Sequence, residues 1–206
     1  MGYLVRKADA FLRGWKQNPD RNPLIIKGAR QVGKTETIRT FARENYKNVV
    51  EINFITEPAY KAIIDEGFST DHIIKLISRI DPTKHFIENE TLIFFDEIQD
   101  FPEIATALKF FKENAKYDVI CSGSLLGVQY QRIASISVGY KTDYQMYSMD
   151  FEEFLWAKGY SEEMVLDMLR HMLDGIAFSE AEHMILSNLF LEYCILGGMP
   201  AIVSNY

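Results

Sequence analysis

The chain has 206 residues, of which 48% are hydrophobic and 25% are charged, and this composition excludes disordered and fibrous proteins. Its 22 Lys and Arg residues against 29 Asp and Glu residues leave a net charge of -7, which argues against bulk binding of nucleic acid by this stretch. No apolar run reaches the roughly 18 residues that a membrane-crossing helix requires, and no secretory signal is visible, so we expect a protein that does not span a membrane.

Apolar periodicity predicts strands that alternate with helices over the first part of the chain. Pro58 and Asp71 mark helix starts, because proline fits the first helical turn and an aspartate side chain can cap a helix. In chain order we expect a helix over 3–17, strand 24–27, helix 35–45, strand 48–54, helices 59–65 and 72–80, strand 91–95, a helix beginning at Pro102, and strands 117–121 and 140–149. Strands separated by helices favour an α/β fold with a parallel sheet of about five strands, covered on both faces.

The last quarter of the chain has a helical composition. Ser161 is a predicted N-cap, and Ser179 with Glu182 forms a predicted capping box. We expect helices over 151–158, 161–173 and 179–196, the last one ended by a pair of glycines. The chain is therefore divided into a predicted α/β core over 1–149 and a predicted helical lid over 150–206.

Cysteine and histidine usage points to neither a disulfide framework nor a metal cage. Cys121 and Cys194 both lie in apolar segments, which favours two free thiols in a reducing, cytoplasmic compartment. The four histidines show no metal-binding spacing with cysteine or acidic residues; they are His72, His85, His171 and His183.

Residues 28–35, G-A-R-Q-V-G-K-T, match the phosphate-binding pattern G-x-x-x-x-G-K-[ST] at every fixed position and lie between a predicted strand and a predicted helix. In such a loop the backbone N–H groups and the helix N-terminus face a polyphosphate. Lys34 would reach the β and γ phosphates, and the Thr35 hydroxyl suits Mg²⁺ as a hard oxygen ligand. Arg30 could contact a phosphate or point outward, and the pattern leaves both open. The predicted nucleotide-binding residues are Gly28, Ala29, Arg30, Gln31, Val32, Gly33, Lys34, Thr35 and Glu36.

A second motif places two acidic residues at the end of the strand over 91–95. Asp96 would hold Mg²⁺, and Glu97 would polarise the water that attacks the γ phosphate. A hydrophobic strand ending in acidic residues is by itself equally compatible with a structural role. Its position downstream of a phosphate loop favours the functional interpretation, and the spacing from Lys34 leaves room for an inserted strand, which is typical of hydrolysing ATPases more than of GTPases or nucleotide kinases.

Further motifs extend over nearly the whole chain. They are N-F at 53–54, D-E-I-Q at 96–99, S-G-S-L-L-G at 122–127, F-E-E-F-L at 151–155 and G-G-M-P at 197–200. With the phosphate loop, they resemble the AAA+ superfamily of P-loop ATPases, in the large prokaryotic AAA-type group whose C-terminal half is usually a domain of unknown function. That group often has Pro-Leu-Ser before F-E-E-F, where this chain has Ser148, Met149 and Asp150.

The resemblance implies roles that the residue pattern alone does not establish. Ser122 or Ser124 would be the sensor that contacts the γ phosphate or its water. We favour Ser122, which would then be a catalytic residue together with Lys34 and Glu97. A turn or a helix cap explains both serines equally well. Arg132 is the nearest candidate for an arginine supplied to an adjoining subunit of a homo-oligomer, although a solvated surface arginine is the more common case. A further C-terminal region, outside this chain, is also implied.

These observations lead to Mg²⁺-dependent ATP binding and hydrolysis that drives a movement of the lid. The preference for adenine follows from the resemblance, together with the lack of an N-K-x-D pattern that reads guanine. One alternative is an ATP-gated switch with little turnover, whose C-terminal region binds DNA or a protein partner. Another is a small-molecule kinase that uses the same loop, against which the lack of a recognisable acceptor site argues weakly.

Overall fold

The computed structural model describes residues 2–124 and 139–206. Contacts within the chain divide it into two units. The sheet unit consists of Leu12–Arg30 and Lys34–Met146, and the helical unit consists of the N-terminal residues through Phe11, Gln31–Gly33 and Tyr147–Tyr206. The predicted boundary between 1–149 and 150–206 stays a prediction.

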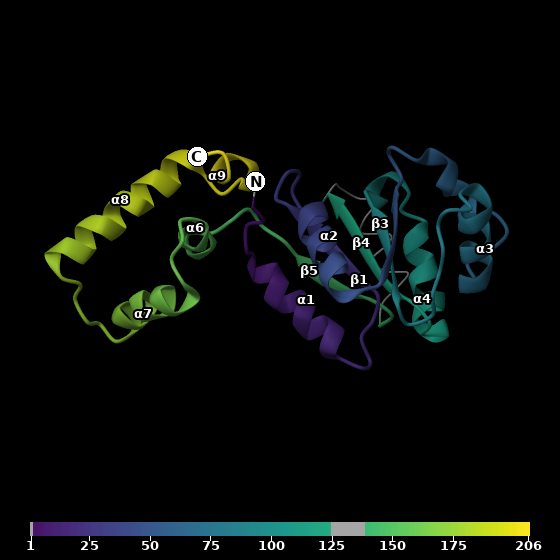
Figure 1. Cartoon of the computed structure of the whole chain (residues 1–206), viewed down its shortest axis with the longest axis horizontal. Helices are drawn as coiled ribbons and strands as arrows, with labels where there is room; N and C mark the ends of the chain where they lie inside the picture. Colours follow the sequence, from purple (N-terminus) through teal and green to yellow (C-terminus); the bar gives the residue numbers. More distant parts are fainter. Residues whose placement is uncertain (1, 125–138) are drawn as a thin grey trace. The chain divides into compact units, whose positions relative to one another are not determined.

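A parallel sheet forms the centre of the sheet unit (Figure 1). Its strands are β1 (Leu24–Gly28), β2 (Asn48–Asn53), β3 (Thr91–Asp96), β4 (Asp118–Ser124) and β5 (Thr142–Gln145). The strand order is β2-β3-β4-β1-β5, and each neighbouring pair is parallel. The predicted α/β class and the parallel sheet of about five strands are therefore confirmed.

One helix precedes β1, and the others connect β1 to β2, β2 to β3 and β3 to β4, because a parallel pair needs a crossover between the end of one strand and the start of the next. They are α1 (Lys7–Gln17), α2 (Lys34–Asn45), the 3₁₀ helix η1 (Pro58–Ile64), α3 (Thr70–Ile80), the 3₁₀ helix η2 (Ile98–Asp100) and α4 (Ile104–Asn114). Figure 1 shows α2 and α4 on opposite sides of the sheet, so both of its faces are covered.

A core cluster of buried hydrophobic side chains lies between one face of the sheet and η1, α3 and α4. Successive strand side chains point to opposite faces, so Ile93 and Phe95 of β3 both enter this cluster. The Phe95 ring lies with its centroid 5.7 Å from that of Phe54 and 6.2 Å from that of Phe111. Burial of these rings holds β3, the strand that ends in the acidic motif, against α4.

The helical unit contains α6 (Phe151–Ala157), α7 (Glu162–Leu173), α8 (Glu180–Leu196) and α9 (Pro200–Val203). The predicted caps are confirmed: Ser161 accepts a hydrogen bond from the amide of Met164, and Ser179 forms a capping box with Glu182. None of the described helices combines the length and the apolarity needed to cross a bilayer.

The G-G-M-P motif has a packing reason within this unit. The carbonyl of Gly198 accepts a hydrogen bond of 2.7 Å from the amide of Met149. A Cβ atom on Gly198 would lie 2.1 Å from the carbonyl oxygen of Met149, so only glycine allows this approach. The motif therefore joins the end of α8 to the residues that precede α6.

Several predicted boundaries are wrong by a few residues. The first helix begins at Lys7 instead of Tyr3, because the Asp9 carboxylate binds the amide of Arg6 ahead of the first turn (2.7 Å). Asp71 lies inside the first turn of α3, and the N-cap is Ser69. The helix predicted over 59–65 is the 3₁₀ helix η1, and α4 begins at Ile104, two residues after Pro102.

The end of the sheet also differs from the prediction. β5 is limited to four residues within the predicted 140–149 strand. The Ser122–Ser124 segment does not follow the fourth strand as a turn but forms the last residues of β4, because β4 continues its pairing with β1 to Ser124. The prediction of two free thiols is confirmed, with Cys121 buried in β4 and Cys194 exposed on α8.

The core cluster predicts a large difference between two phenylalanines. Phe95→Ala removes a fully buried ring and should lower the free energy of unfolding by about 3–5 kcal/mol in urea or guanidinium titrations. Phe110→Ala, a matched change on a ring that is 36% exposed, should cost about 1 kcal/mol. Equal losses for the two variants would contradict the assigned core.

Candidate functional site

The candidate site lies at the carboxyl edge of the sheet. In a parallel sheet all strands end at the same edge, and ligands bind there. β1 ends at Gly28, β2 at Asn53, β3 at Asp96 and β4 just beyond Ser122, and these four strands are neighbours. The register pairs Gly28 with Ser124 and Asn53 with Asp96. The topology thus gathers polar residues from distant parts of the sequence at one edge.

The predicted phosphate loop connects β1 directly to α2. Gln31 and Gly33 adopt positive φ angles of 64° and 96°, which turn the chain sharply between strand and helix. Lys34 and Thr35 form the first turn of α2, where free backbone N–H groups and the helix dipole favour an anion. This is the local geometry that the motif predicted.

The Lys34 ammonium is folded back into the loop. Its Nζ atom donates hydrogen bonds to the carbonyl oxygens of Gly28 (3.0 Å) and Ala29 (2.7 Å). Burial lowers the pKa of Lys34, while the charges of Glu97 and Asp96 act in the opposite direction. The net direction means that the folded protein disfavours this positive charge, which a bound anion would stabilise.

Asp96 is the most constrained group of the site. Its carboxylate is 2% exposed and accepts hydrogen bonds from the hydroxyls of Thr35 (3.2 Å) and Ser122, the Asn53 amide (3.2 Å) and the backbone of Glu97 (3.0 Å). Burial nevertheless raises the pKa of Asp96, and the nearby charge of Glu97 adds to the rise. A cation at this carboxylate would relieve the cost of burying its charge.

The donor set of Thr35 and Asp96 fits Mg²⁺. Both residues offer hard oxygen atoms, and the Thr35 Oγ1 atom lies 3.2 Å from Asp96 Oδ2. Mg²⁺ keeps several water ligands and is typically bound through one or two protein groups together with substrate phosphates. Over residues 2–124 and 139–206, no group of three or more His, Cys, Asp or Glu side chains could hold a metal ion by itself. A shared site between protein and nucleotide is the arrangement that these residues allow.

Glu97 follows β3 in a left-handed backbone conformation with a φ angle of 56°. Non-glycine residues seldom adopt this conformation, and those that do are concentrated at functional sites. The Glu97 carboxylate accepts a hydrogen bond from the side-chain amide of Gln99, whose carbonyl oxygen accepts from the backbone of Ser124 (3.0 Å). A Cβ on Gly123 would lie 3.1 Å from that Gln99 oxygen, so a glycine at this position leaves room for the Gln99 side chain.

Two of these residues received no role from the sequence. Asn53 binds Asp96, and Gln99 links Glu97 to β4. Both lie within motifs recognised in the sequence, N-F and D-E-I-Q, so the signal was present. What it lacked was the distant partner of each side chain, Asp96 for Asn53 and Ser124 for Gln99, because these partners lie on other strands.

The other residues that the sequence predicted for nucleotide binding or catalysis differ in their exposure. Ala29, Arg30, Gln31 and Glu36 are exposed, and Val32 is buried. Arg132 and the L-L-G part of the S-G-S-L-L-G motif fall outside the described residues. The roles assigned to these positions stay predictions.

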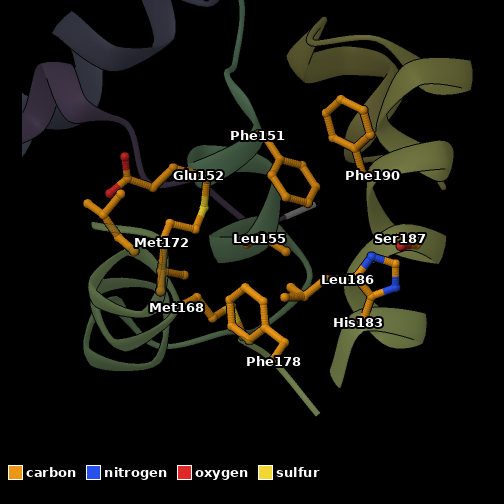
Figure 2. Close-up of a pocket in the computed structure, with 12 residues that line it drawn as sticks. Phe151, Glu152, Leu155, Met168, Met172, Phe178, His183, Leu186, Ser187 and Phe190 are labelled. Atoms are coloured by element: carbon orange, nitrogen blue, oxygen red, sulfur yellow. The ribbon is translucent and has the colours of Figure 1, made fainter. Parts of the chain in front are cut away.

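Apart from the sheet edge, a cavity of about 440 Å³ lies within the helical unit between α6, α7 and α8 (Figure 2). Phe151, Met168, Phe178 and Phe190 contribute much of its lining. The lining includes no Lys or Arg from the described part of the chain, so it does not offer the charges that a polyphosphate needs. The chemistry therefore points to the sheet edge and away from this cavity.

Comparisons with known proteins place most of the chain in one domain family. The model of the AAA domain family matches residues 20–155. No curated protein matches the chain. Among solved structures, PCH-2 of C. elegans has a TM-score of 0.44 and 10% identity, covering 85% of this chain and 50% of that one.

Another similar structure is the Aeropyrum pernix ORC1 protein in complex with DNA, with a TM-score of 0.46 and 12% identity, covering 73% of this chain and 48% of that one. The chain thus spans about half the length of these two proteins. The family assignment depends on the domain match, which covers most of the chain and agrees with the resemblance of its motifs to AAA+ P-loop ATPases. The chain belongs to the AAA domain family.

Proposed function

We propose that the protein binds ATP together with Mg²⁺ at the carboxyl edge of its sheet and hydrolyses the γ-phosphate bond. The observation that carries this proposal is the meeting of three groups at one edge: the folded-back ammonium of Lys34, the hydroxyl of Thr35 and the buried carboxylate of Asp96. The family match supports a nucleotide-binding ATPase domain, and the site supplies the finer chemistry.

Binding would be divided between the loop and the first turn of α2. The backbone N–H groups of residues 28–35 donate to the phosphates, and Lys34 turns its ammonium from the loop carbonyls to the β and γ phosphate oxygens. Thr35 and Asp96 would hold Mg²⁺, which when bound would neutralise charge on the phosphates.

Hydrolysis requires a group that accepts a proton from water. Glu97 adjoins the metal-binding carboxylate and is held by Gln99, so it is the residue that we assign to orient and polarise the attacking water. Ser122 donates to Asp96 from the next strand, which supports its assignment as the group that senses the γ phosphate.

The alternative of an ATP-gated switch has one observation in its favour. The Glu97 carboxylate is engaged by Gln99, and a carboxylate held in this way could be kept from the water. In that case ATP binding would be the signal, read by a DNA or protein partner through a C-terminal region outside this chain. The resemblance to AAA+ ATPases also supports a homo-oligomer, and the two free thiols favour a cytoplasmic location.

Lys34→Met tests the binding step. The change should weaken Mg-ATP binding roughly 100-fold in calorimetric titrations, because hydrogen bonds to charged groups contribute about 1.5–3 kcal/mol. The unfolding midpoint without nucleotide should stay the same or rise, since burial already disfavours the charge. Lys47→Met, which removes an exposed lysine paired with Glu90, is the matched control and should bind ATP normally. Undiminished binding by Lys34→Met would refute the assignment.

Glu97→Gln separates hydrolysis from the switch. We expect the variant to keep its affinity for Mg-ATP while phosphate release falls by about 10²–10⁴-fold, the usual contribution of a general base. Glu103→Gln, a change at an exposed glutamate before α4, should leave phosphate release unchanged. Wild-type protein that binds ATP but releases no phosphate would favour the switch.

Asp96→Asn tests the buried carboxylate through pH. The pKa of Asp96 is raised in the folded protein, so stability due to its protonated form is present at low pH and is lost as the pH rises through the folded pKa. The wild type should therefore lose more stability than the Asp96→Asn variant as the pH rises from acid to neutral, which thermal unfolding across that pH range measures. The variant should also lose the Mg²⁺-dependent stabilisation by ATP. The same pH dependence of stability in the variant and the wild type would contradict the raised pKa of Asp96.

A further inference from the structure

Arg6 precedes every motif in the sequence, yet its side chain is buried against the phosphate loop. Only 4% of the residue is exposed. Its Nη1 atom donates a hydrogen bond of 2.6 Å to the carbonyl oxygen of Val32, the loop residue between Gln31 and Gly33. All four residues belong to the helical unit. An arginine from the N-terminal segment therefore binds the backbone of the loop directly.

The same guanidinium also binds the segment that leads into α6. Its Nη2 atom donates to the carbonyl oxygen of Tyr147 (2.8 Å), and its Nε atom lies 3.1 Å from Glu153 Oε1 in an ion pair. Both side chains of this pair are about 95% buried. Guanidinium has a rigid planar set of nitrogen atoms, which allows one side chain to donate two hydrogen bonds and form an ion pair at once.

Glu153 is itself held in one orientation. It closes the capping box of α6 by accepting from the amide of Asp150 (3.2 Å), and it accepts from the amide of Lys7 (2.7 Å). The Glu153 side chain therefore cannot turn without losing its capping hydrogen bond at the start of α6 and its bond to the Lys7 amide. Because Glu153 is held in place, its ion pair with Arg6 also fixes the guanidinium that donates to the Val32 carbonyl.

The contact with Val32 has a consequence for the next amide. In a trans peptide the carbonyl of one residue and the N–H of the following residue point in opposite directions. Holding the Val32 carbonyl toward Arg6 therefore directs the Gly33 N–H away from Arg6. Phosphate loops bind their ligand through backbone N–H groups, so the orientation of this peptide decides whether one of the donors is available.

We propose that Arg6 is a positioning residue for nucleotide binding: it sets the orientation of the Val32–Gly33 peptide and, through Glu153, makes that orientation depend on an intact start of α6. The inference depends on the proposed binding of nucleotide by the loop. A partner or ligand that moves α6 would regulate the phosphate loop through Arg6.

The decisive variant removes both charges together. A single change at Arg6 or Glu153 leaves a buried charge unpaired, which could unfold the protein for reasons unrelated to the loop. Arg6→Met with Glu153→Met removes the whole ion pair at similar volume, and such replacements are often neutral for stability. Arg6→Lys is the second variant, because one ammonium can pair with Glu153 but cannot also reach the carbonyls of Val32 and Tyr147.

The two variants are compared with wild type and with Lys7→Met by thermal unfolding, by calorimetric titration with Mg-ATP and by hydrogen exchange of the 28–33 segment without nucleotide. Lys7 is the matched control, because its ammonium pairs with Asp150 and Glu152 at the start of α6 from an exposed position. We expect at least one Arg6 variant to unfold near the wild-type temperature, to bind Mg-ATP roughly tenfold to a hundredfold more weakly and to exchange faster in the loop.

A folded Arg6 variant with wild-type affinity and wild-type loop exchange would overturn the inference. The inference would also be overturned if a variant bound less Mg-ATP only because less of it was folded, while hydrogen exchange of the loop in the folded fraction stayed unchanged. If wild type binds no Mg-ATP, the proposed function fails, and the exchange measurement still decides whether Arg6 orders the loop.

Discussion

The parallel direction of the strands is the constraint on which the site depends. Because β1, β2, β3 and β4 all run the same way, their carboxyl ends meet at one edge. This brings Asp96 next to Thr35, although 61 positions separate them in the sequence. Reversing one strand would send its terminal residue to the far edge and dismantle the site without any change in its residues.

The buried charges of the edge show a second property of the site. Folding disfavours the charged form of both Lys34 and Asp96, since burial moves the pKa of each toward the neutral form. A structure optimised only for stability would place neutral groups there. Binding and catalytic residues commonly lower the stability of the ligand-free protein in this way, because the ligand supplies the missing counter-charge when it binds.

Three residues of the phosphate loop are assigned to the helical unit. Gly28 and Lys34 belong to the sheet unit, whereas Gln31–Gly33 belong to the helical unit together with Arg6 and α6. The buried contact of Arg6 with Val32 gives this division a physical basis. The proposed positioning role of Arg6 depends on this contact.

The sequence by itself determined the α/β class, most helix and strand positions and the phosphate loop, because these depend on local periodicity, capping and glycine spacing, as at Ser161 and Ser179. Element ends were less certain: β4 runs on through Ser124 because pairing with β1 continues, a contact that local sequence does not encode. Only the tertiary structure decided that Asn53 binds Asp96, that Gln99 binds the backbone of Ser124 and that Arg6 binds the loop. Each of these contacts joins segments far apart in the chain, and such partners are chosen by strand order and packing instead of by neighbours in sequence.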